Sequence, residues 1–192
     1  MKASKFLAAS ALALSAMLAS TQASAQFFIG GSIGQGDIDD EVTEGLITSG
    51  TVDGKDTAFK IFGGYMFNRH FGVEAAYVNF GEATYSGDFF GSPVTGGKIE
   101  IDGFNLSAIG SAPITEQFSI FGKVGLFLWD AEASDTTAGL PFSAKDDGSD
   151  VSFGIGVGYN FSRNLGVRAE WEMFQTDAAD VTLLSVGLLW SF

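Results

Sequence analysis

Residues 150–161 read DVSFGIGVGYNF, and every second side chain in this stretch is apolar or aromatic, while the others are glycine or small and polar. An unbroken alternation of this kind places the two sets on opposite faces of a β-strand. Residues 181–192 repeat the pattern, with apolar side chains at each even position from 184 to 192. The chain is therefore expected to consist of strands that have one apolar face.

Alternating segments recur along the chain and are joined by links of unequal length. Short polar turns follow the second, fourth and sixth segments, whereas longer links follow the first, third and fifth. Most segments are long enough to cross a bilayer, which takes a tilted strand of about 9–11 residues. This arrangement predicts an all-β fold, an eight-stranded antiparallel up-and-down transmembrane β-barrel. The predicted strands are 26–35, 56–67, 71–82, 98–111, 118–130, 150–161, 165–175 and 181–192.

Two phrases, YMFNRHFGVEAAY at 65–77 and YNFSRNLGVRAEW at 159–171, repeat the pattern Tyr-x-Phe-x-Arg-x-x-Gly-Val-x-Ala. Each phrase covers the end of one predicted strand, a tight turn and the start of the next strand, so each is a short hairpin. An ancient internal repeat or a constraint shared by the two turns would explain the similarity. The position between the shared Val and Ala holds Glu74 in the first phrase and Arg168 in the second. The third and seventh strands of such a barrel stand on opposite walls, so we expect these two side chains to point inward and to meet across the lumen.

An eight-stranded barrel can be a soluble carrier with apolar side chains inside, or a membrane protein with its apolar face toward lipid. Three features favour the membrane barrel. The face opposite the apolar one is rich in glycine and serine, which suits a crowded interior, and the chain stops on an apolar alternation. Aromatic side chains gather where strands meet turns, as in the girdles found at the lipid–water boundary. The predicted girdle consists of Tyr65, Phe67, Phe71, Phe118, Tyr159, Phe161 and Trp190.

The first 25 residues have the features of a cleaved secretory signal. Lys2 and Lys5 form a basic region, residues 6–18 are apolar, and residues 23–25 read ASA, a small-x-small cleavage sequence. The predicted domains are therefore a signal peptide at 1–25 and an outer-membrane barrel at 26–192. Removing the two lysines from the net charge of −13 leaves −15, an acidity that argues against a nucleic-acid partner. The chain has no cysteine, so an exported protein would be stable here without disulfides.

Several motifs occur in an order that resembles one known family. The stretches NRHFGVEAAYVNFG at 68–81, GKVGLFLWD at 122–130, the run from 150 to 174 and SVGLLWSF at 185–192 are similar to small outer-membrane β-barrels of the OmpA-like/opacity-protein superfamily. The resemblance implies a bacterial outer-membrane location, lipid surroundings, and a last strand that the barrel-assembly machinery recognises. We expect a monomer. Unlike full-length members of the family, the sequence ends at the barrel, so the resemblance implies no cell-wall tether. The assembly signal carried over from the family comprises Leu184, Val186, Leu188, Trp190 and Phe192.

Six charged side chains fall within predicted strands on the inward face. The interior of so narrow a barrel is filled by side chains, and buried charges require partners. The preferred interpretation is a plug that holds the barrel shut, and the alternative is a gate or a narrow proton or ion path. The predicted interior charge network comprises Lys60, Glu74, Lys123, Arg168, Glu170 and Glu172.

Other residue patterns indicate little chemistry. The acidic runs GDIDDEVTE at 36–44 and KDDGSD at 145–150 are typical of solvated loops, with loosely held divalent cations shared with lipid headgroups as the alternative. The only histidine, His70, lies on a short turn, so we expect no enzyme, no metal site and no cofactor. Aromatic and apolar residues at 89–90 and 140–142 are equally consistent with partner contacts and with packing onto the barrel rim.

These features together predict an outer-membrane protein with a structural and surface-interaction role, which supports membrane integrity and presents acidic loops to a partner. A narrow porin-like channel for ions or small solutes is the alternative. A soluble lipocalin-like carrier is a third possibility, which a requirement for detergent or lipid would refute.

Overall fold

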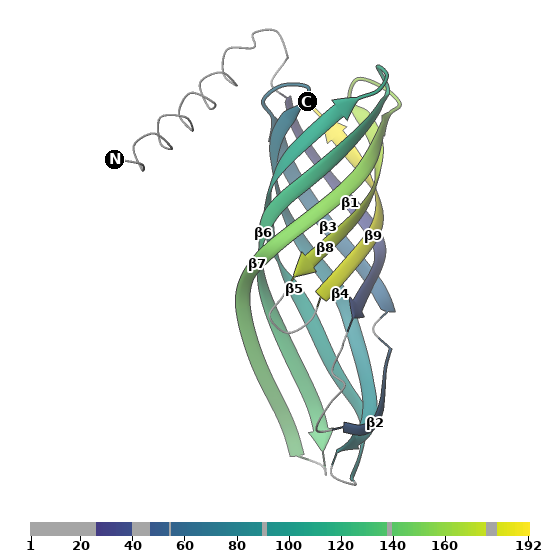
Figure 1. The fold of residues 1–192 in the computed structure, drawn as a ribbon, viewed down its shortest axis with the longest axis vertical. Coiled ribbons are helices and arrows are strands. Elements are labelled where there is room, and N and C mark those ends of the chain that lie inside the picture. Colours follow the sequence, from purple (N-terminus) through teal and green to yellow (C-terminus); the bar gives the residue numbers. More distant parts are fainter. Residues whose placement is uncertain (1–25, 40–46, 54, 90–91, 138–139, 176–179) are drawn as a thin grey trace, which may run out of the picture.

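The computed structural model describes residues 26–39, 47–53, 55–89, 92–137, 140–175 and 180–192, and the predicted signal peptide at 1–25 lies outside this part of the chain. Its nine strands form one antiparallel sheet in the order β2-β4-β3-β1-β9-β8-β7-β6-β5. Because β4 also pairs with β5, the sheet closes into the barrel that Figure 1 shows. The strands are β1 (Gln26–Asp39), β2 (Ile47–Asp53), β3 (Lys55–Met66), β4 (Phe71–Phe89), β5 (Ser92–Pro113), β6 (Phe118–Thr137), β7 (Leu140–Asn160), β8 (Leu165–Gln175) and β9 (Asp180–Ser191).

Eight of these strands form the barrel wall, as predicted, and only the short β2 lies outside it, paired to β4 alone. The seam between the first and last strands is a full antiparallel ladder, in which Ile33 stands opposite Val186. No helix among the described residues is long and apolar enough to cross a membrane.

The three predicted tight turns are confirmed, and they share one local device. In the turn between β3 and β4, Asn68 Oδ1 accepts hydrogen bonds from the backbone N–H groups of His70 and Phe71, at 2.8 and 2.9 Å. Thr115 Oγ1 and Ser162 Oγ accept bonds from the same two relative positions in the other two turns. Asn, Ser and Thr side chains commonly close turns in this way. The residue that closes the turn, Asn68 in one repeated phrase and Ser162 in the other, is not among the residues that the phrases share, so this device does not by itself explain their similarity.

The predicted long links after the third and fifth strands are wrong, because these segments continue as paired strand. β4 and β5 remain paired as far as Phe89 opposite Ser92, and β6 and β7 as far as Thr137 opposite Leu140. The acidic run at 145–150 is consequently part of β7 rather than a loop. The alternation of side chains fades there because both faces of a hairpin beyond the membrane meet water, while backbone hydrogen bonding continues regardless of side-chain polarity.

The barrel rim opposite the short turns is uneven. Strands β4 to β7 extend well past the ends of β8 and β9, and Figure 1 shows them as a long projection on one side of the barrel. At the base of the first hairpin the pairing of β4 with β5 shifts register between Asn79 and Glu82. Gly81 lies in this irregularity with a φ of 81°, a left-handed conformation that glycine adopts without steric cost.

The two faces of the wall divide as the sequence predicts. Large apolar side chains at alternate positions point outward and are exposed, among them Phe104 at 63 % and Leu188 at 59 %. The positions between them are buried, as the pattern of β8 illustrates. An outer wall made of exposed apolar side chains is stable only in contact with lipid or another apolar surface.

The filled barrel interior as candidate functional site

The six predicted interior charges all lie inside the barrel and are almost inaccessible to solvent. Lys60 comes from β3, Glu74 from β4, Lys123 from β6, and Arg168, Glu170 and Glu172 from β8. Their residue exposures range from 1 to 7 %. They point inward because each shares the parity of the buried positions of its strand.

Lys123 is the centre of this interior charge network. Its Nζ donates hydrogen bonds to Glu74 Oε1 at 3.1 Å, to Glu170 Oε2 at 2.6 Å and to Glu172 Oε1 at 2.7 Å. Lys60 projects into the lumen from β3. Its Nζ donates a hydrogen bond to Glu170 Oε2 at 2.8 Å and also bonds Glu172. Four strands are thereby connected across the lumen through side chains.

The expected meeting of Glu74 and Arg168 is present in the structure. Arg168 Nη1 donates to Glu74 Oε2 at 2.6 Å, and its Nε forms an ion pair with Glu170 that lacks hydrogen-bond geometry. The guanidinium carbon also lies 3.4 Å from the centre of the Phe62 ring, in the range of a cation–π contact. Arg168 is thus held both by carboxylates and by an aromatic face.

The network is electrically balanced, since three cations face three carboxylates. Balance matters because a buried ion without a partner costs several kcal/mol of desolvation. Bringing all six together offsets that cost by mutual attraction and hydrogen bonding. The arrangement can hold the walls together and can resist the entry of a net charge.

Aromatic layers enclose the network on both sides, and the sequence analysis missed them. On the side of the long hairpins, Phe80, Phe127 and Phe174 form an outer aromatic cluster with ring centres 4.7 to 5.9 Å apart. On the side of the short turns, Phe28 and Phe62 lie 6.4 Å apart and form an inner aromatic pair. The alternation along each strand could have predicted them. Phe62 lies on the same inward face of β3 as Lys60, and Phe174 lies on the same inward face of β8 as Glu172.

Glycines on neighbouring strands make room for these interior rings. A Cβ atom added to Gly30 would lie 2.3 Å from Phe62 Cζ, and one added to Gly64 would lie 2.3 Å from Phe28 Cζ. No real Cβ approaches so closely, so each ring fits against its neighbour only because that neighbour has no side chain. The glycine-rich inward face therefore serves as the complement of large aromatic side chains.

The predicted girdle residues gather at the short-turn end of the barrel. Tyr65 contacts Phe67 and Tyr159 contacts Phe161, with ring centres 5.4 and 5.3 Å apart. Five members are exposed, while Tyr65 and Phe118 are half-buried. In the predicted assembly signal, the side chains at 184, 186, 188, 190 and 192 all point outward and are exposed, Phe192 at 67 %. These positions are compatible with both predictions and test neither role.

Acidic side chains face outward on the long hairpins, just beyond the apolar belt. Asp102, Asp130 and Asp147 stand opposite one another across β5, β6 and β7. In the next row out, Lys145 Nζ forms an exposed ion pair with Glu132, 2.9 Å away. This hydrogen bond raises the pKa of Lys145. No group of three or more His, Cys, Asp or Glu residues in the described ranges is arranged to hold a metal ion.

The remaining predicted candidates contribute little to the interior. His70 lies on the exposed turn between β3 and β4, with Nδ1 3.2 Å from the carbonyl oxygen of Ser111. Most of the acidic run at 36–44 lies outside the described residues. The side chains of the aromatic and apolar residues at 89–90 and 140–142 are likewise outside the described part of the structure.

A closed eight-stranded barrel with an apolar outer wall and a polar, filled interior defines the class of small bacterial outer-membrane β-barrels. The family model described as "OmpA-like transmembrane domain" matches residues 22–185, and the chain belongs to this family. The protein is located in the bacterial outer membrane.

Individual relatives agree with the family assignment. Outer membrane protein A of Salmonella typhi is 30% identical over 141 residues, which cover 68% of this chain and 39% of that protein. The chain thus spans about two fifths of the length of the curated relatives it matches.

Two solved structures show the same fold. OprG from Pseudomonas aeruginosa matches with a TM-score of 0.66 at 15% identity, over 88% of this chain and 97% of that one. Ail, the attachment invasion locus protein of Yersinia pestis, matches with a TM-score of 0.59 at 16% identity, over 88% and 99%.

Proposed function

We propose that the chain is a closed, non-conducting barrel that reinforces the outer membrane and presents its long hairpins to partners at the cell surface. The observation that supports this function is the filling of the lumen. A buried and neutral charge network lies between the outer aromatic cluster and the inner aromatic pair. Ions need a continuous polar path, and each aromatic layer interrupts such a path.

A narrow ion channel is the second candidate, and one observation favours it. Ser32 Oγ, Ser185 Oγ and Arg168 Nη2 are buried and have no hydrogen-bond partner among the described residues. Ser32 stands opposite Lys60 in the ladder, and Ser185 stands opposite Glu170, so these atoms border the charge network. Polar groups placed in this way could coordinate a permeating ion or a file of water molecules.

Single-channel conductance of the refolded barrel in a planar lipid bilayer distinguishes the two candidates. We expect a silent wild type, and we expect Glu74→Ala to remain closed or to unfold while both aromatic layers are present. Removing rings from the outer cluster and the inner pair together, as in Phe80→Ala with Phe62→Ala, should permit leakage when combined with Glu74→Ala. Lys145→Ala, which alters only an exposed ion pair, is the matched control. Discrete conductance steps in the wild type would establish the channel instead.

The acidic hairpins limit what kind of surface partner the protein can bind. The Ail structure was determined in complex with the heparin analogue sucrose octasulfate, a polyanion. The outward row of Asp102, Asp130 and Asp147 would repel such a ligand, so we propose a cationic or neutral partner for this chain. Binding of nanodisc-embedded protein to a lysine-rich peptide should exceed binding to heparin, and should weaken as salt is added. Tighter binding to heparin would contradict the proposal.

The proposal includes export through the signal at 1–25, insertion as a monomer by the barrel-assembly machinery, and no catalytic activity or cofactor. The position of His70 on a short turn supports the absence of catalysis, because it lies far along β4 from the long-hairpin rim. N-terminal sequencing of the protein recovered from outer membranes tests the export step. The expected first residue is Gln26.

A further inference from the structure

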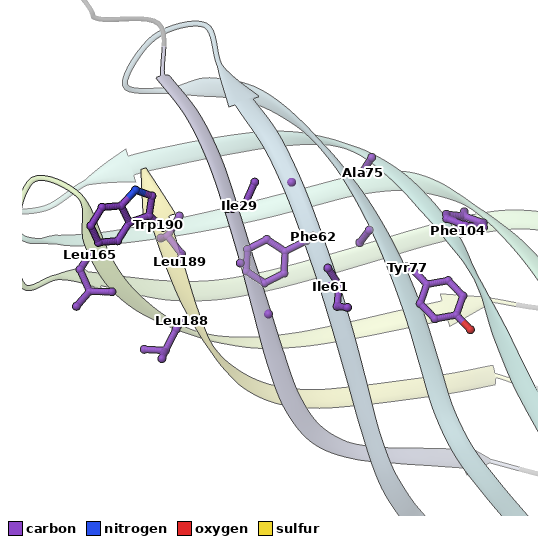
Figure 2. A pocket seen from close by; sticks show the side chains of 14 residues that line it. Ile29, Ile61, Phe62, Ala75, Tyr77, Phe104, Leu165, Leu188, Leu189 and Trp190 are labelled. Atoms are coloured by element: carbon purple, nitrogen blue, oxygen red, sulfur yellow. The ribbon is translucent and has the colours of Figure 1, made fainter. Parts of the chain in front are cut away.

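The lipid-facing wall of the barrel is hollowed where β1, β3 and β4 run side by side. One groove of about 710 Å³ extends from Leu165 and Trp190 to Tyr77 and Phe104, and Figure 2 shows these side chains at its two ends. A second groove of about 680 Å³ runs toward the short-turn end, where Tyr65 lines it. Both volumes lie within the roughly 300–1,000 Å³ range of small-ligand sites.

Small residues at outward positions cause this hollow. The two grooves share Ile29, Gly63 and Ala75, and Gly63 stands opposite both of the others in the ladder. Gly31 adds a second position without a side chain to the floor. Around them, the side chains of Ile61, Tyr77, Phe104, Leu188 and Trp190 rise as a rim.

We propose that an acyl chain of a membrane phospholipid binds in this hollow more tightly than on the rest of the barrel wall. The two adjoining grooves that form the hollow are together called the Gly63 groove. The groove faces the bilayer, so lipid is the molecule at hand. Association inside a membrane depends on close van der Waals packing, because lipid tails are as apolar as the wall itself. A thin, flexible chain can follow a groove floor between raised side chains. The convex wall of a second barrel would rest on the rim and leave the floor empty.

The charge distribution around the groove assigns the lipid to the inner leaflet. The second groove ends at Phe27, Tyr65 and Phe192, at the short-turn end that faces the periplasm in this class of barrel. The adjoining turn carries Arg69, exposed to solvent, which can pair with a phosphate group. At the opposite end of the groove, the Tyr77 hydroxyl donates a hydrogen bond to Asp102 Oδ2, 3.0 Å away, and this carboxylate repels phosphate.

The glycines allow a test that fills the groove without disturbing the fold. A Cβ atom at Gly63 would meet its nearest neighbours, Ile29 Cγ2 and Phe28 O, at 3.6 Å, which is an ordinary contact. The matched control is Gly122→Leu on β6, also an outward glycine with an unobstructed Cβ position, 3.7 Å from Gly154 O. Gly63→Leu therefore fills the groove, while Gly122→Leu adds the same side chain to another part of the wall.

Native mass spectrometry of protein released from vesicles of phosphatidylethanolamine and phosphatidylglycerol measures the phospholipid that stays bound. We expect wild type and Gly122→Leu to retain one phospholipid, and Gly63→Leu to retain it about tenfold less, which corresponds to about 1.4 kcal/mol. Arg69→Ala should also lower retention while the groove stays open. Equal retention by wild type and Gly63→Leu, with urea unfolding in vesicles showing that both are folded, overturns the proposal. A dimer that chemical cross-linking traps in wild type and Gly122→Leu, but not in Gly63→Leu, also overturns it, because the groove would then bind a second barrel. None of these outcomes depends on whether the barrel conducts.

Discussion

Lys123 shows how much a single side chain can contribute to this fold. It bonds three carboxylates at once, so its loss leaves the interior with a surplus of negative charge. We expect Lys123→Met to lower the free energy of unfolding by about 3–5 kcal/mol, as breaking a buried ion pair does. Urea unfolding in lipid vesicles, followed by tryptophan fluorescence, measures the change.

The control for this prediction is another lysine in an ion pair. Lys145 bonds Glu132 on the exposed hairpin, and exposed pairs contribute roughly 0–1 kcal/mol. Lys145→Met should accordingly leave the unfolding curve almost unchanged. Similar losses for the two variants would mean that the interior network does not stabilise the barrel.

Gly30 illustrates the opposite case, in which the absence of a side chain is essential. A methyl group there would collide with the Phe62 ring and with the carbonyl oxygen of Leu188. We expect Gly30→Ala to cost about 1–3 kcal/mol of unfolding free energy, as overpacking does. Gly110→Ala, whose Cβ meets nothing within 4 Å, should be neutral or slightly stabilising in the same urea titration. A neutral Gly30→Ala would show that the interior rings can shift.

At the scale of single elements, the sequence predicted the membrane part of each strand well. Alternation is imposed there by lipid on one side and a packed lumen on the other, so it is visible in the residues, as in 150–161. Beyond the membrane both faces are wet, and the hairpin extensions of β4 to β7 left no such pattern. The inner aromatic pair was not predicted, because each ring packs against a glycine on the neighbouring strand. Only the register of β1 with β3 shows which glycine lies beside which ring.

In the acidic row across β5, β6 and β7, the carboxylate on the middle strand has a like charge on each side, so its removal tests how much cross-strand repulsion destabilises the hairpins. Asp130 stands opposite Asp102 on one side and Asp147 on the other, and like charges directly opposite destabilise a sheet. We expect Asp130→Asn to raise the unfolding free energy by about 0.2–1 kcal/mol per relieved pair in low salt. The gain should shrink at high ionic strength, because exposed charges are screened.

Glu132→Gln provides the comparison, since Glu132 bonds Lys145 and also stands opposite Glu100, so this substitution removes an attraction together with a repulsion. That substitution should be neutral or mildly destabilising under the same conditions. A gain for Glu132→Gln equal to that for Asp130→Asn would point to general charge reduction rather than cross-strand repulsion.

At the scale of the whole molecule, the last strand must join both β8 and β1 for the barrel to close. Phe192 is exposed at 67 % and packs little against the folded protein, so its proposed importance lies in assembly. We expect Phe192→Ala to reduce the amount of folded protein in outer membranes several-fold while leaving the stability of refolded protein almost unchanged. Heat-modifiable mobility on gels measures the folded fraction in each case.

Phe104→Ala is the matched variant, since Phe104 is a lipid-facing phenylalanine of similar exposure, 63 %, on β5 rather than on the last strand. Its effect on the yield in cells should be small. If both variants lose the same yield, the last strand has no special role in recognition.

The long paired hairpins also bear on how the protein survives at a cell surface. A protease binds its substrate as an extended segment with free backbone N–H and C=O groups, and such segments are usually found in surface loops. In this chain much of the corresponding backbone is already hydrogen-bonded to a neighbouring strand, for example from Asp130 opposite Asp147 out to Thr137 opposite Leu140. Cleavage between these pairs requires several ladder bonds to open first. The extensions of β6 and β7 can therefore reach away from the membrane and still resist digestion.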